Sequence, residues 1–295
     1  MQNYVLSCCS TADLSHEHFA SRDIHYICFH FYMDGVEYTD DLGKSMPFED
    51  FYAAMQNGTD TKTAQVSAGE YAEYFEQFLA AGQDVVHVTL SSGLSGTHMS
   101  ARAAANILAE KYPERKIYIV DSLGASSGYG LIMDKLADLR DSGMGAAELA
   151  AWVEENRLTM HHWFFSSDLT FFVKGGRVSK TAGAIGGILG ICPLLNMDNE
   201  GHLIPREKVR PKKRVINRIV EMMKEHAEGG LAYNGKCYIC HSACYDDARA
   251  VADLVEAAFP NLNGKVLINN IGTTIGSHTG PGTVALFFWG DRRVD

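Results

Sequence analysis

The chain has 295 residues, 46% of them hydrophobic, so it is long enough for two globular domains with a sizeable core. Its formal net charge of −10 disfavours non-specific binding to nucleic acid, which requires a basic surface. No apolar run reaches the roughly 18 residues that cross a bilayer, and residues 1–10 do not resemble a signal peptide. With seven cysteines, an odd number that suits reduced thiols, these features predict a cytoplasmic protein without a transmembrane segment.

The first half of the chain alternates strand-like runs with helical patterns. The predicted strands are residues 5–9, 24–33, 85–90 and 116–121, and the predicted helices are residues 98–112, 129–140 and 146–157. This alternation is typical of a parallel, Rossmann-like sheet with helices on both faces. Residues 141–145 form a glycine-containing break, the helix predicted at 146–157 after it is the expected hinge, and we expect an N-terminal α/β domain over residues 1–157.

The second half has a different pattern. The predicted strands are residues 163–167, 193–197, 202–210, 236–242, 265–271 and 284–290, and the predicted helices are residues 181–190, 211–226 and 246–259. A turn at Asn199-Glu200-Gly201 favours a hairpin between the second and third of these strands. We therefore expect a C-terminal α/β domain over residues 158–295, with a mixed or antiparallel sheet. The last strand belongs to this domain or returns to the first.

A serine-rich turn from Ser91 to Thr97 joins a predicted strand to a predicted helix. The first turn of a helix has unpaired N–H groups and partial positive charge, so it favours an anion such as carboxylate or phosphate. The hydroxyls of Ser92 and Ser95 add hydrogen-bond donors, at the edge of the sheet where ligands usually bind. The simpler alternative is that Ser95 or Thr97 only caps the helix.

A second motif, Ile271 to Gly282, places His278 among glycines after a predicted strand. We expect a loop here, because glycine lets backbone approach a ligand closely, and histidine changes charge near neutral pH. A serine hydrolase or acyltransferase is one alternative function, with Ser95, His278 and Asp121 as its triad. Against it, Gly96 follows Ser95 directly, which departs from the Gly-x-Ser-x-Gly nucleophile motif.

Basic residues cluster in this acidic chain at residues 206–214, a run that contains Arg210, and Arg177 lies in the glycine turn Lys174-Gly175-Gly176-Arg177. Such groups steer an acidic partner or shield a transferring phosphate. Alternatively, the basic cluster has no binding role and its side chains are simply solvated at the end of a strand and the start of a helix.

The segment Cys237-Tyr238-Ile239-Cys240-His241 matches a haem-attachment pattern, and with Cys244 it offers zinc ligands. Adjacent side chains of a strand point to opposite faces, so Cys240 and His241 are expected to diverge. We interpret these cysteines as structural and expect neither a metal nor a cofactor.

Taken together, these motifs resemble the DegV family. The matching segments are Ser91-Ser92-Gly93-Leu94-Ser95-Gly96-Thr97, Val120-Asp121-Ser122, Lys174-Gly175-Gly176-Arg177-Val178, Cys192-Pro193-Leu194-Leu195 and His278-Thr279-Gly280-Pro281-Gly282. The resemblance implies two α/β domains with a fatty acid buried between them. It also implies, for some members, a role as the subunit that presents the acyl carboxylate to a separate ATP-dependent fatty acid kinase.

The resemblance further implies which residues bind the carboxylate: Thr63, Ser95 with its neighbours Ser92 and Gly96, and His278. Two departures stand out. The family's Thr-Ser-Gln-Pro-Ser segment reads Thr63-Ala64-Gln65-Val66-Ser67 here, and its Thr-Asp-Ser segment reads Cys8-Cys9-Ser10. These changes are consistent with a divergent subgroup that has a different ligand or lacks a kinase partner.

A fatty acid requires a dry tunnel for its tail, worth about 0.8 kcal/mol per buried methylene, and hydrogen bonds for its carboxylate. Hydroxyls and an imidazole meet the second need without a permanent cation. Candidate tunnel walls are Phe29, Phe31, Phe164, Phe165, Ile185, Ile188 and Leu189. We therefore expect a non-catalytic protein that binds one long-chain fatty acid and presents it to a kinase, with a carrier of another amphiphile as the remaining alternative.

Overall fold

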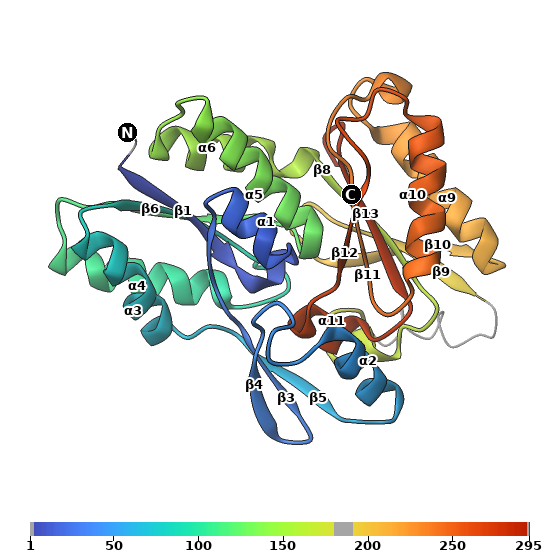
Figure 1. Cartoon of the computed structure of the whole chain (residues 1–295), viewed down its shortest axis with the longest axis horizontal. Coiled ribbons are helices and arrows are strands. Elements are labelled where there is room, and N and C mark those ends of the chain that lie inside the picture. The colour runs from blue at the N-terminus through green and yellow to red at the C-terminus, as the bar shows by residue number, and fades with distance from the viewer. Residues whose placement is uncertain (1–2, 180–190, 294) are drawn as a thin grey trace.

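The computed structural model describes residues 3–179, 191–293 and 295. The helix expected at residues 181–190 lies outside the described residues, so its prediction stays open. The described strands form three sheets, with the N-terminal sheet and the C-terminal sheet side by side and a small third sheet below them (Figure 1).

The N-terminal sheet consists of four parallel strands in the order β2-β1-β6-β7. They are β1 (Tyr4–Cys9), β2 (His25–Ile27), β6 (Asp84–Thr89) and β7 (Ile117–Asp121). Four longer helices accompany them: α3 (Ala68–Ala80), α4 (Thr97–Lys111), α5 (Ser126–Asp141) and α6 (Ala146–Asn156). The prediction of a parallel sheet is confirmed.

Helices cover both faces of this sheet, as the side-chain alternation of β1 shows. Val5 and Cys9 pack in a cluster with residues of α3 and α4, whereas Leu6 and Cys8 pack in another cluster with residues of α5 and α6. Side chains two apart on a strand share a face, so each face buries its own apolar row. The short helices η1 (Ser10–Ala12) and α1 (His16–Ser21) follow β1.

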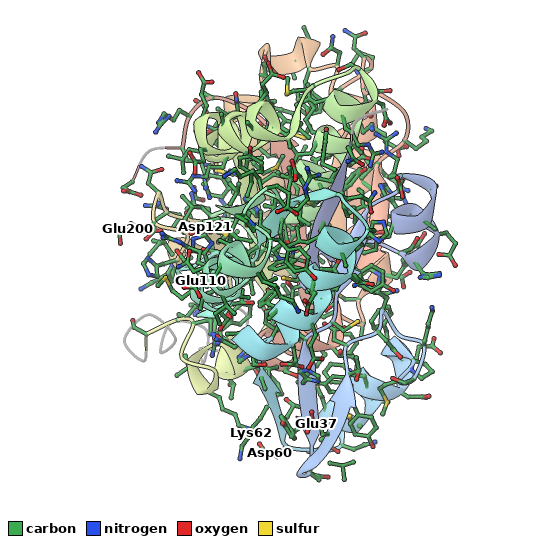
Figure 2. All side chains as sticks on the ribbon, turned by 90° about the vertical axis from the view of Figure 1, so that its left-hand side faces the viewer. Glu37, Asp60, Lys62, Glu110, Asp121 and Glu200 are labelled. Carbon is green, nitrogen blue, oxygen red and sulfur yellow. The ribbon has the colours of Figure 1, made fainter. Side chains whose placement is uncertain are left out.

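The small third sheet corrects the prediction of one strand over residues 24–33. That run is divided between β2, in the parallel sheet, and β3 (His30–Met33), which pairs antiparallel with β4 (Val36–Thr39) and β5 (Thr61–Ala64). A two-residue hairpin at Asp34-Gly35, both with positive φ, closes β3 onto β4. Helix α2 (Phe48–Gln56) packs on this sheet, whose outer end carries Glu37, Asp60 and Lys62 (Figure 2).

The C-terminal sheet has six strands in the order β10-β9-β8-β13-β11-β12, and only β11 and β12 pair in parallel. The strands are β8 (Met160–Ser166), β9 (Cys192–Met197), β10 (Leu203–Val209), β11 (Tyr238–His241), β12 (Leu267–Asn270) and β13 (Thr283–Trp289). The mixed sheet and the hairpin between β9 and β10 agree with the sequence-based expectation. The last strand, β13, lies inside this sheet between β8 and β11.

Helices α9 (Lys212–His226) and α10 (Tyr245–Ala258) cover one face of the six-stranded sheet. Its other face carries Phe164, Cys240 and Phe287, which share a cluster of buried residues with helix α5 of the N-terminal part. The two large sheets therefore contribute to one continuous apolar core. The remaining short helices are η2 (Arg157–Thr159), α7 (Thr170–Lys174), η3 (Gly230–Ala232) and α11 (Thr273–Thr279). Over the described residues, no helix combines the length and hydropathy needed to span a membrane.

Candidate binding pocket

A pocket of about 430 Å³ lies between the N-terminal and C-terminal parts. This volume is within the range of small-molecule sites. From the N-terminal part it is lined by Phe29, Thr63, Ala64, Gln65, Leu90, Leu94, Ser95, Ala125 and Ser126. From the C-terminal part it is lined by His162, Phe164, Phe172, Arg177, Met197, Leu203, Cys240, Ile271, Thr274, Ile275, His278, Thr279, Thr283, Ala285 and Phe287. Most of these side chains are apolar, and polar groups concentrate at its two ends.

His278 and Thr63 meet at one end of the pocket, although 215 residues separate them in the chain. The Nε2 atom of His278 lies 2.8 Å from the hydroxyl oxygen of Thr63, and its Nδ1 atom is buried with no hydrogen-bond partner. Burial, with a smaller contribution from the charge of Arg177, lowers the pKa of His278 to about 4. The imidazole is therefore neutral at pH 7.

The backbone around His278 differs from the expected loop, because residues 273–279 form the short helix α11. Gly280, with a φ of +65°, ends this helix. A second glycine makes room for the imidazole: a Cβ atom on Gly175 would lie 2.3 Å from Nδ1 of His278. The glycine turn before Arg177 and the histidine motif are therefore packed against each other.

Arg177 lines the same end of the pocket as His278. Its guanidinium donates hydrogen bonds to two backbone carbonyls, those of Gly175 and, at 3.1 Å, Leu94. Burial lowers its pKa from the usual value, without removing its charge at pH 7. The structure thus holds one cation close to the neutral hydroxyl and imidazole groups.

Ser95 lines the pocket and also accepts a hydrogen bond from the first N–H of helix α4, whose N-cap residue is Gly96. Its hydroxyl donates to Oε1 of Gln65 at 3.2 Å and accepts the N–H of Thr97 at 3.2 Å. The two interpretations of the serine turn are therefore compatible. Gln65 was not among the predicted site residues, although it lies two residues after Thr63 and also lines the pocket.

Three predicted residues do not line the pocket. Ser92 is exposed and its N–H donates to the Asp121 carboxylate at 3.2 Å. Gly96 is exposed beside the pocket, where a Cβ atom would lie 2.9 Å from Oε1 of Gln65. Arg210 lines a separate groove at the end of β10 and the start of α9, so the basic cluster and Arg177 occupy different places.

The triad considered from the sequence is not assembled in the described part of the chain. Ser95 donates to Gln65, and His278 pairs with Thr63. Asp121 accepts the N–H groups of Ser92 and Leu123, which orders the strand-to-helix turns instead of orienting an imidazole.

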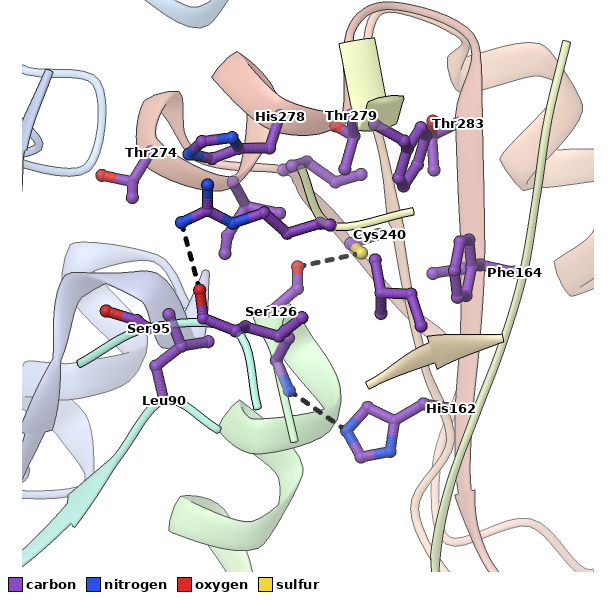
Figure 3. A pocket seen from close by; sticks show the side chains of 18 of the residues that line it. Leu90, Ser95, Ser126, His162, Phe164, Cys240, Thr274, His278, Thr279 and Thr283 are labelled. Carbon is purple, nitrogen blue, oxygen red and sulfur yellow. Dashed lines mark hydrogen bonds between the residues drawn. The ribbon is translucent and has the colours of Figure 1, made fainter. Parts of the chain in front are cut away.

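The other end of the pocket contains polar groups that sequence reasoning missed. Figure 3 shows His278 and Thr274 at one end, His162 at the other, and Ser126 and Cys240 between them. Nδ1 of His162 lies 3.2 Å from the carbonyl oxygen of Met160, and burial lowers its pKa well below the usual value. No motif indicates a pocket role for Ser126 or His162, and Cys240 belongs to a motif that was interpreted as structural, because only the folded chain brings these segments together.

Only some of the residues predicted as tunnel walls line the pocket. Phe29 and Phe164 line the pocket, whereas Phe31 is buried beside Phe51 in the third sheet and Phe165 faces the helices α9 and α10. The candidates Ile185, Ile188 and Leu189 lie outside the described residues.

The cysteine motif of β11 is buried, and its residues diverge as expected for a strand. Cys240 lines the pocket, 3.1 Å from the hydroxyl of Ser126, whereas the ring of His241 packs edge-on against Tyr245. Within the described residues one other group has potential metal ligands: His161, His226 and Asp291, with ligand atoms within 4.8 Å. The two imidazoles are stacked at an interplanar angle of 20°, so their lone pairs lie in nearly parallel planes, which disfavours a shared metal.

These features define a two-part α/β protein with an amphipathic pocket where the parts meet. The family model described as "Uncharacterised protein, DegV family" matches residues 9–291. The chain belongs to the DegV family.

Known proteins are similar over nearly the whole chain. A DegV domain-containing protein of Clostridium perfringens is 33% identical over 293 residues, 99% of each chain. The structure described as DegV, a fatty acid binding protein from Bacillus subtilis, is 25% identical with a TM-score of 0.83, over 99% of this chain and 100% of that one. The Fatty Acid Kinase (Fak) B3 protein of Streptococcus pneumoniae, loaded with linoleic acid, is 22% identical with a TM-score of 0.84, over 98% and 100%.

Proposed function

We propose that this protein binds one long-chain fatty acid in the pocket between its two parts. The observation that carries the proposal is the pairing of a mainly apolar pocket of about 430 Å³ with the hydroxyl–imidazole contact of Thr63 and His278 at one end. The tail gains about 0.8 kcal/mol for each methylene that leaves water. The Bacillus subtilis relative is described as a fatty acid binding protein, which supports the same class of ligand.

The carboxylate is bound at the end that contains Thr63, Ser95 and His278. Hydroxyl groups donate to a carboxylate and offset the cost of its burial. Nδ1 of His278 is buried against Gly175, so the ring acts through Nε2: when Nε2 carries the proton it donates to Thr63, and the Thr63 hydroxyl is free to donate to the carboxylate. The Ser95 hydroxyl has a single proton, which it donates to Oε1 of Gln65 in the structure, so binding exchanges this acceptor for the carboxylate.

We further propose that the protein presents this carboxylate to an ATP-dependent kinase subunit and does not catalyse the transfer itself. Arg177 lies at the carboxylate end, held by the Leu94 carbonyl, and its charge suits an incoming phosphoryl group. The Streptococcus pneumoniae relative, described as a fatty acid kinase B protein, supports such a partner.

Native mass spectrometry of the purified protein, followed by solvent extraction, tests the ligand. A one-to-one complex that releases a long-chain fatty acid is expected. A different extracted amphiphile, or no binding after incubation with fatty acids, would contradict the proposal.

The Arg177→Ala variant tests presentation. It should retain fatty acid and lose acyl-phosphate formation when mixed with a fatty acid kinase and ATP, with wild-type protein as the control. Loss of the lipid itself would show that Arg177 belongs to the carboxylate site instead.

A further inference from the structure

Two buried carboxyl groups approach the same glycine, Gly272, beside residues that line the pocket. Asp13, at the end of η1, is 4% exposed, and Asp40, after β4, is 1% exposed. Both approach Gly272, the residue before α11: a Cβ atom there would lie 2.5 Å from Oδ1 of Asp13 and 3.5 Å from Oδ1 of Asp40. The two Oδ1 atoms therefore border the same small space.

The hydrogen bonds of the pair leave these two oxygens unsatisfied. Oδ2 of Asp13 accepts the hydroxyl of Ser126, and Oδ2 of Asp40 accepts the Ser10 hydroxyl at 3.3 Å and the Thr274 N–H at 3.4 Å. Oδ1 of each carboxyl group has no hydrogen-bond partner in the described part of the protein. Two ionised carboxylates buried in this way would cost several kcal/mol.

No basic side chain of the described residues compensates the pair. The titratable groups that face it are Tyr52 of α2, Cys240 of β11, Tyr26 of β2 and Cys28, and burial raises the pKa of each, so all four are neutral at pH 7. The neighbouring Asp41 turns away and accepts the N–H groups of Lys44 and Ser45. With no cation beside the two carboxyl groups, a bound proton is what removes one of their two negative charges.

The two acids differ in how well they tolerate charge. Burial raises the pKa of both, and the charge of Asp40 raises that of Asp13 further. Asp40 accepts two hydrogen bonds, from the Ser10 hydroxyl and the Thr274 N–H, and the nearby Thr273 and Thr274 hydroxyls also lower its pKa. Asp13 accepts one, from the Ser126 hydroxyl, and the Gly272 backbone also lowers its pKa. The ionised form is therefore better supported at Asp40.

We propose that Asp13 and Asp40 hold one proton between them, and that they act as positioning residues for helix α11. Asp13 carries the proton, which makes its Oδ1 a donor toward Oδ1 of Asp40. The ionised Asp40 holds the start of α11 through the Thr274 N–H. Thr274 and His278 of this helix line the pocket, so the two acids also position the polar end of the proposed fatty acid site. Only this last consequence rests on the proposed function.

The sign of the pH dependence follows from the raised pKa of Asp13. The folded protein keeps a proton that the unfolded chain has already lost above its ordinary pKa of about 4. Stability is therefore lost progressively as pH rises from about 4 to the folded-state pKa of Asp13, above which both carboxyl groups are ionised beside Gly272.

Three variants test the assignment in ligand-free protein, with thermal unfolding followed from about pH 5 into the alkaline range. Asp13→Asn imitates the protonated acid and should abolish the loss of stability with rising pH. Asp40→Asn removes the anion at α11 and should lower the unfolding temperature already at neutral pH. Asp41→Asn, the neighbouring acid, should leave the loss of stability with rising pH unchanged.

Infrared spectroscopy in deuterium oxide detects a protonated carboxyl group directly, and so distinguishes a shared proton from a merely structural role of the two acids. Wild-type protein at neutral pH should show the C=O band of a protonated carboxyl group, and Asp13→Asn should lose that band. An unaltered loss of stability with rising pH in Asp13→Asn, no protonated band in the wild type, or a stoichiometric bound metal by elemental analysis would each overturn the proposal. Release of a pre-bound fatty acid, measured separately, tests the link to the pocket.

Discussion

The polar end of the pocket combines side chains that have little in common along the sequence. Thr63 comes from β5 of the third sheet, Ser95 from the serine turn and His278 from α11. None of the three carries a formal charge when the imidazole is neutral, so the proposed carboxylate would be bound by hydrogen bonds, with Arg177 left for the incoming phosphoryl group. A neutral environment would also leave the carboxylate oxygen nucleophilic, which suits the proposed phosphorylation.

At this scale we predict that Ser95→Ala weakens fatty acid binding by about 1–3 kcal/mol, because one hydrogen bond to a buried carboxylate is lost. His278→Ala should have an effect of similar size. Ser92→Ala is the matched control, since Ser92 is exposed in the same turn and does not line the pocket. Calorimetric titration with a long-chain fatty acid measures the three affinities, and equal affinities would disprove the carboxylate assignment.

At the scale of elements, the contact between α7 and α11 brings the glycine turn onto the histidine. Gly175 has an ordinary φ of −73°, so its lack of a side chain serves the approach of His278 and not the backbone conformation. Gly176 is the opposite case, because its φ is +73° and a Cβ atom there would have no other atom within 4 Å.

These neighbouring glycines make a matched pair. Gly175→Ala should displace His278 and reduce fatty acid affinity severalfold, because the new methyl would lie 2.3 Å from Nδ1. Gly176→Ala should cost about 1 kcal/mol of folding free energy through its positive φ and leave the affinity unchanged. Thermal unfolding and binding titration separate the two effects. The reverse pattern would refute the packing argument.

At the scale of the whole molecule, four histidines with strongly lowered pKa values make stability depend on pH. Burial lowers the pKa of His87 to about 3 and those of His161 and His278 to about 4, and it lowers the pKa of His162 well below the usual value. The unfolded chain binds protons at these residues below about pH 6.5, whereas the folded chain does not.

We therefore predict that the free energy of unfolding falls as pH drops from 7 to 5.5, by about 1.4 kcal/mol for each histidine that stays neutral one unit below its unfolded pKa. The proton proposed for Asp13 acts in the opposite direction and reduces the net slope. Chemical denaturation at several pH values measures the effect. The His87→Gln variant should reduce the slope of unfolding free energy against pH, whereas the control His16→Gln, at an exposed position, should not. A flat profile for the wild type would contradict the prediction.

Much of the fold and part of the site were predictable from local patterns. The alternation of strands and helices predicted the parallel sheet, the Asn199-Glu200-Gly201 turn predicted the β9–β10 hairpin, and the family resemblance indicated Thr63, Ser95 and His278. The third sheet was missed because residues 24–33 read as one apolar run, although Asp34-Gly35 is a hairpin signal.

The sequence alone determined the periodicity of the chain and the chemistry of its motifs, since both depend on residues close together in the chain. The tertiary structure decided which of those groups meet. Gln65, Ser126, His162 and Cys240 enter the pocket, Ser92 and Arg210 do not line it, and β13 joins β8 and β11. The same holds for the acid pair at Gly272, because burial and long-range contacts, and not local spacing, set the environment of a titratable group.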